Sequence, residues 1–161
     1  MKMSLQDWRK NGWIRAHPTS AQEIDSLLAV IDRDVLASGN TSLDSDWRFA
    51  IAYNAALQAA AVALKASGFD VPKGGGAHQR TIESLRLTIE ENRTVVDALQ
   101  QCRARRGGGI YEATGIASDA EVAELRELAM SLRDHVRAWL KKNHPGLITV
   151  GAQPKKPGKR K

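Results

Sequence analysis

Residues 102–115 read CRARRGGGIYEATG, and this run contains the side chains best suited to chemistry. Arg103, Arg105 and Arg106 precede three glycines, and Tyr111 follows them. Guanidinium groups bind phosphate and stabilise the charge that develops during phosphoryl transfer, and a nearby phenol can hydrogen-bond the same group. The run therefore indicates a phosphate site. Cations followed by glycines are also typical of an ordinary helix end, so both interpretations stay open.

The remaining candidates for chemistry are four histidines and one cysteine. None of the histidines stands at metal-ligand spacing with a second ligand, so we expect neither a metal nor a cofactor; they are His17, His78, His135 and His144. His78 follows the glycine run 74–76 and is a further candidate for phosphate contact, with helix capping as the alternative. No strand precedes that glycine run, so it is not a nucleotide-binding fingerprint. Cys102 is expected in the core.

Composition indicates one soluble domain. The chain has 161 residues, 42% apolar and 26% charged, which is ordinary for a globular protein. We expect no membrane span or signal peptide, and with a single cysteine the cytoplasm is the expected location.

The net charge is +6, but five of the 24 basic residues lie in the last seven positions, leaving 19 against 18 acidic ones. Residues 146–161 are therefore expected to form a disordered basic tail, with non-specific nucleic-acid binding as the alternative.

Helices must position these side chains, since no segment alternates as a strand would. Apolar residues repeat every three or four positions, between helix start and stop signals, at 20–39, 44–67, 78–89, 92–106 and 118–143. Capping boxes are predicted at Ser20–Glu23 and Ser118–Glu121. The alanine-rich segment 44–67 is apolar on most faces and should lie centrally. The predicted fold is all-α, an up-and-down antiparallel bundle of about five main helices over 19–145, preceded by an arm with a short helix at 1–18.

Three segments, in this order, resemble the bacterial HEPN-domain proteins (higher eukaryotes and prokaryotes nucleotide-binding): DWRFAIAYNAALQAAAVALKASGF, HQRTIESL and the run that begins CRARRGGGIYEATG. The resemblance covers about residues 20–145. It implies a helical bundle that pairs into a homodimer. Many members of the family are metal-independent ribonucleases of toxin–antitoxin or defence systems, others accompany a minimal nucleotidyltransferase, and some only bind nucleotides.

The resemblance also implies roles for individual residues. Active members carry an arginine that holds the scissile phosphate, a polar residue after it, and a histidine about five positions on that assists proton transfer with the ribose 2′-hydroxyl; two such motifs meet across the dimer. Arg106 matches the arginine, Gly107 stands at the polar position and Tyr111 at the histidine, as in a tyrosine-ended variant of this branch. A phenol with an ordinary pKa near ~10 is a poor general base at pH 7.

These matches leave two functions open. The first is nucleotide or RNA phosphate binding at a dimer cleft, with Arg106 and Tyr111 as catalytic residues of a degenerate ribonuclease and Arg103, Arg105 and His78 as further phosphate contacts. The second is a non-catalytic helical subunit that binds a minimal nucleotidyltransferase or an antitoxin.

Overall fold

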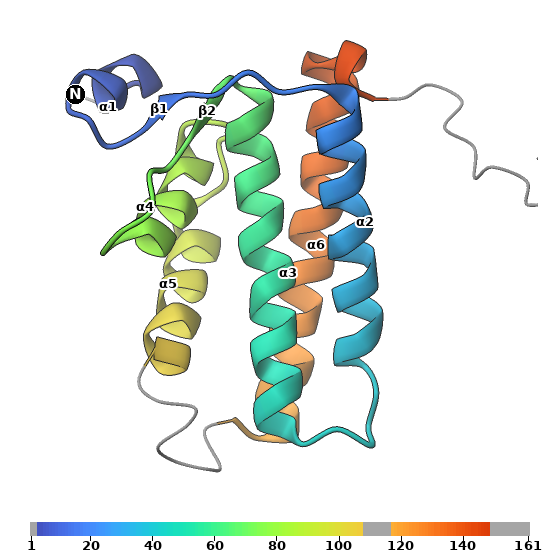
Figure 1. Ribbon diagram of the computed structural model, residues 1–161. Coiled ribbons are helices and arrows are strands. Elements are labelled where there is room, and N and C mark those ends of the chain that lie inside the picture. Colours follow the sequence, from blue (N-terminus) through green and yellow to red (C-terminus); the bar gives the residue numbers. More distant parts are fainter. Residues whose placement is uncertain (1–2, 108–116, 149–161) are drawn as a thin grey trace, which may run out of the picture.

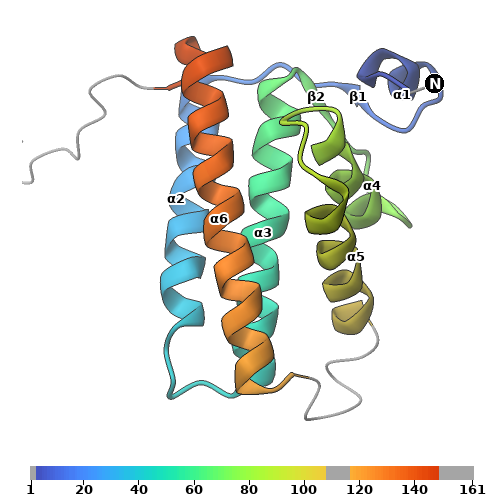
Figure 2. The same cartoon turned by 180° about the vertical axis from the view of Figure 1, so that it is seen from behind.

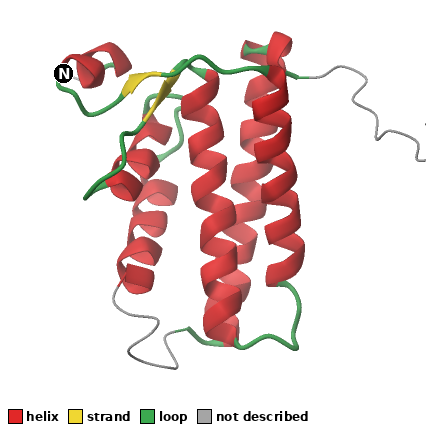
Figure 3. Ribbon diagram, in the orientation of Figure 1, coloured by secondary structure: helices red, strands yellow, loops and turns green. Residues whose placement is uncertain are grey.

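The computed structural model describes residues 3–107 and 117–148, which form the all-α bundle that the sequence predicts (Figures 1 and 3). Within them lie six α-helices: α1 (Leu5–Lys10), α2 (Ala21–Ser38), α3 (Ser45–Ala66), α4 (Ala77–Glu83), α5 (Arg93–Gly107) and α6 (Asp119–Asn143). Two short 3₁₀ turns complete the helical structure, at Ser84–Arg86 and Pro145–Leu147. The longer helices α2, α3, α5 and α6 alternate in direction along the chain, as an up-and-down bundle requires (Figure 1).

α3 is the central helix, as its composition predicts. It packs against α2 and α6 on one side and against α4 and α5 on the other, and Figure 2 shows the first group from behind. Most of its side chains are buried, and many are alanines, which let neighbouring helix backbones approach closely.

By length and composition alone α3 passes as a membrane span, contrary to the sequence-based expectation, but 67% of its most apolar stretch is buried inside the protein. Such burial is typical of a core helix, and the fold is compatible with a soluble protein.

The two predicted capping boxes differ in the structure. At α6, the Ser118 hydroxyl accepts the Glu121 N–H, and the Glu121 carboxylate accepts the Ser118 N–H, so this box is complete. At α2, the Ser20 hydroxyl accepts the Glu23 N–H, but the Glu23 carboxylate turns away from the helix end. The prediction of a full box at α2 was therefore half wrong, because stronger partners compete for that carboxylate.

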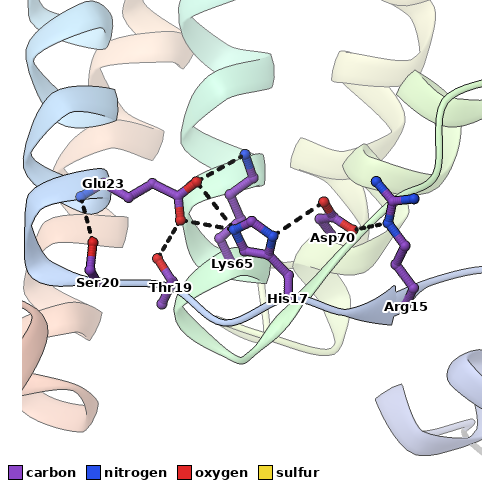
Figure 4. Close-up of polar contacts among 7 residues, drawn as sticks. All are labelled: Arg15, His17, Thr19, Ser20, Glu23, Lys65 and Asp70. Carbon is purple, nitrogen blue, oxygen red and sulfur yellow. Dashed lines mark hydrogen bonds and ion pairs between the residues drawn. The ribbon is translucent and has the colours of Figure 1, made fainter.

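Those partners fix the N-terminal arm to the bundle (Figure 4). Glu23 accepts hydrogen bonds from the Thr19 hydroxyl at 2.6 Å and lies 2.9 Å from Nε2 of His17. The other ring nitrogen of His17 lies 3.4 Å from Asp70, which also pairs with Arg15 at 2.8 Å. A row of hydrogen bonds and ion pairs thus joins the arm to α2 and to the segment after α3.

Next to this row, the arm forms a small strand pair that the sequence gives no sign of. β1 (Arg15–Ala16) pairs antiparallel with β2 (Phe69–Asp70). Two residues are too few to produce a recognisable alternation, and the fold remains all-α. Ile14 and Phe69 pack with Leu64 of α3 in a second, smaller apolar cluster beside the main core.

Two other boundaries differ from the sequence prediction. The helix expected at 78–89 ends at Glu83, where Ser84 begins a 3₁₀ turn and its hydroxyl donates to the Thr81 carbonyl. At the C-terminal end of the described residues, Leu147 and Ile148 pack against the core, beyond the expected start of the tail at 146. The rest of the predicted tail, 149–161, lies outside the described residues, as does Tyr111.

Candidate phosphate-binding site

Three elements enclose a cavity of about 460 Å³ on the side of the bundle formed by α4 and α5. α3 supplies its floor, α4 and the preceding loop one wall, and the C-terminal part of α5 the other. Its polar lining consists of Tyr53, Lys73, His78, Gln79, Arg103 and Arg106. The structure therefore brings together three of the residues expected to contact phosphate, namely His78, Arg103 and Arg106.

The glycine run shapes the wall that carries His78. Gly74 and Gly76 have φ values of 142° and 85°, which side-chain-bearing residues rarely adopt. The chain can therefore turn sharply from Lys73 into α4. His78 consequently lies in the first turn of that helix, exposed at the cavity edge.

The opposite wall is cationic. Arg103 and Arg106 are three residues apart on α5 and thus lie on one face of the helix. The guanidinium of Arg106 lies 5.6 Å from the Tyr53 ring centre, and its Nε atom is buried with no hydrogen-bond partner among the described residues. Arg103 donates from Nε to the Gln100 side chain at 2.7 Å. Within residues 3–107 and 117–148, neither arginine forms an ion pair, and nor does Lys73.

The other polar pair of the site joins Tyr53 to His78, with 3.3 Å between the phenolic oxygen and Nδ1. Burial raises the pKa of Tyr53 to about 12 despite the lowering effect of the two arginines, so the phenol stays protonated. Partial burial, followed by the charges of Arg106 and Arg103, lowers the pKa of His78, so its imidazole is neutral at pH 7. If the imidazole donates Nδ1–H to the phenol oxygen, Nε2 is left as a base.

Arg105 does not belong to this group, contrary to the sequence-based expectation. It lies on another face of α5, where its Nη2 donates to the Glu121 carboxylate of α6 at 3.1 Å and its guanidinium lies 5.5 Å from the Phe49 ring centre. This pairing lowers the pKa of Glu121 to about 2. Arg105 therefore ties α5 to α6, and a phosphate in the cavity would not meet it.

The remaining candidate residues are His135, His144 and Cys102, and each contacts other residues of the bundle. His135 bonds Glu91 at 2.8 Å, and His144 packs against the Trp139 ring. Cys102 is half-buried against the core, as expected, and burial raises the pKa of its thiol, which makes it a weak nucleophile. In the described part of the chain, no three His, Cys, Asp or Glu side chains are placed to hold a metal ion.

Three polar residues of the site were missed by sequence reasoning, namely Tyr53, Lys73 and Gln79. Tyr53 lies in the alanine-rich helix, where the sequence pattern predicts a buried core residue. It is indeed only 2% exposed. Lys73 was passed over as part of a loop. A basic residue directly before a glycine run was the available signal, because such loops approach anions closely.

No family model matches the chain, and neither a curated protein nor a solved structure matches it. In the described part of the chain, the fold and site define an all-α bundle with a cationic cavity whose Arg103, Arg106 and Lys73 form no ion pair, beside a neutral histidine.

Proposed function

We propose that this protein binds a phosphate group of RNA or a nucleotide in the cavity between α4 and α5, as a HEPN-like member of a toxin–antitoxin or defence-type module acting in the cytoplasm. The observation that carries the proposal is the convergence of two arginines on one cavity. Arg93, Arg105 and Arg137, on other faces, all pair with carboxylates. Arg103 and Arg106 converge on a cavity without a carboxylate partner among the described residues, and a phosphate supplies the missing negative charge.

The same arrangement suits metal-independent cleavage of RNA. His78, rather than Tyr111, is then the general base that takes the proton of a ribose 2′-hydroxyl. The 2′-oxygen attacks phosphorus, the bond to the 5′-oxygen breaks, and that oxygen takes a proton from water. The products are a 2′,3′-cyclic phosphate and a 5′-hydroxyl. Arg106 and Arg103 neutralise the charge that builds on the phosphorus oxygens in the transition state.

Salt dependence tests the binding directly. Each phosphate contact contributes a slope of about −0.7 to a plot of log K against log salt for a single strand. We expect Arg103→Ala to reduce that slope by about one contact, measured by fluorescence anisotropy of a labelled single-stranded RNA over a sodium chloride series. Arg105→Ala is the matched control, because that arginine pairs with Glu121. Equal slopes for wild type and Arg103→Ala would contradict the assignment.

The resemblance to HEPN proteins adds a second subunit to the proposal. The cavity is then half of a cleft shared by two copies of the chain, and an antitoxin or a nucleotidyltransferase is a further partner. We expect light scattering to give twice the mass of one 17.6 kDa chain. A monomeric mass at the concentrations used for RNA binding would remove the shared cleft from the proposal, but not the phosphate pocket.

A further inference from the structure

A second, smaller cavity lies on the same helix as the phosphate pocket. It has a volume of about 190 Å³ and is lined by Trp8, Trp13, Gln79, Arg80 and Glu83. Gln79 also lines the phosphate pocket, so this exposed side chain separates the two cavities. A ligand that spans Gln79 would therefore contact cationic side chains in the first cavity and tryptophan side chains in the second.

The arm is folded so that two indoles meet beside α4. Gly12, at φ 77°, ends α1 in the left-handed conformation, and its N–H donates to the Arg9 carbonyl at 2.9 Å. The next N–H, that of Trp13, reaches back to the Trp8 carbonyl at 3.0 Å. This is a Schellman motif, and it packs the Trp13 ring edge-to-face on Trp8, with 5.9 Å between ring centres. Trp13 nevertheless remains 37% exposed.

Arg80 lies over the face of the Trp13 ring. Its guanidinium lies 4.6 Å from the centre of the Trp13 ring. In the described part of the chain Arg80 forms no ion pair, and its Nη1 atom is buried without a hydrogen-bond partner. Glu83, the neighbouring carboxylate, is bound by both terminal nitrogens of Arg93 instead. Arg80 is therefore held by the indole rather than by a countercharge.

Flat indole and guanidinium surfaces are what proteins use to stack unpaired bases. We infer that the Trp13–Arg80 cavity holds an unpaired base of a single-stranded RNA whose neighbouring phosphate lies between Arg103 and Arg106. This inference rests on the proposed function and adds the substrate class, namely a single strand with an accessible base. A base-paired duplex keeps its bases stacked on one another and is bound through its phosphates alone.

The test compares an oligouridylate with an abasic ribose-phosphate oligomer of equal length, by fluorescence anisotropy on the full-length protein. We expect wild type to prefer the oligouridylate. Trp13→Ala and Arg80→Ala should each weaken its binding by roughly 5- to 100-fold, the range for one stacked base. Both variants should bind the abasic oligomer as wild type does. Trp13→Phe keeps a ring for stacking and should retain most of the affinity, which separates loss of stacking from collapse of the arm.

Trp47→Ala is the matched control, because Trp47 is a 50% exposed tryptophan near the start of α3, at the far end of the bundle from α1. Equal loss of both oligomers in Trp13→Ala, or equal binding of both by wild type, would overturn the inference while the phosphate pocket stands. Failure of wild type to bind either oligomer would overturn the pocket as well as the base site.

Discussion

Replacing Arg106 with alanine is expected to lower RNA cleavage by about 10²–10³-fold, the usual loss when one charge-stabilising donor is removed from an active site. Arg106 stacks over Tyr53, and its buried Nε has no partner among the described residues, so this guanidinium is held ready for a ligand. Binding of the uncleaved strand should weaken less than cleavage does, because the charge on the phosphate oxygens increases in the transition state. The measurement is the rate of cleavage of a labelled RNA in excess chelator.

Arg105→Ala is the control for this variant too, since it removes an arginine from the same helix without touching the cavity. Thermal unfolding of both variants separates loss of fold from loss of function. Cleavage that persists in Arg106→Ala, or that falls equally in Arg105→Ala, would count against the site. A wild-type protein that binds RNA without cleaving it would limit the pocket to recognition.

The second large effect is expected at His78. His78→Gln keeps a hydrogen-bonding side chain but cannot take a proton at neutral pH, so we expect cleavage to fall by about 10²–10⁴-fold with little change in RNA affinity. The wild-type rate should rise with pH as the imidazole loses its proton. Because burial and the two arginines lower the pKa of His78, the midpoint of that rise should lie below the ordinary histidine value of 6.5.

The pH profile also distinguishes a catalytic role from a structural one. Arg103→Ala removes one of the charges that lower the pKa of His78, so the rising limb should move to higher pH in that variant. His135→Gln, on α6, changes a histidine bound to Glu91 and should leave both the rate and the profile as they are. A His78→Gln enzyme with the wild-type profile would assign proton transfer to another group.

The bundle could be predicted from the sequence because its signals are local. Apolar residues at helical spacing, the serine caps and the glycines each report on a few neighbouring positions, and α2, α3, α5 and α6 begin and end within one or two residues of the predicted bounds. The end of α4 could not be predicted this way, since its apolar pattern continues through Leu85 and Ile89 while the backbone tightens into a 3₁₀ turn.

The site was harder to predict because it depends on partners far away in the sequence. Three arginines within four residues look alike in the sequence, and only the position of Glu121 on α6 takes Arg105 out of the group. The approach of His78 to Tyr53, 25 residues away, likewise follows from how α4 packs on α3. The face shared by Arg103 and Arg106 was available from their spacing alone. Pairing of Arg106 with Tyr111 lies outside the described residues and stays a prediction.

The crowded alanines of α3 have a consequence for how such a protein diverges. Ala55, Ala59, Ala60 and Ala63 are fully enclosed, so there is no room at these positions for even a valine without displacing a neighbouring helix. Larger side chains are therefore expected to be tolerated at the surface of the bundle rather than along the buried face of α3. The side chains of α4, α5 and the arm that line the two cavities can change while the packing of α3 stays the same.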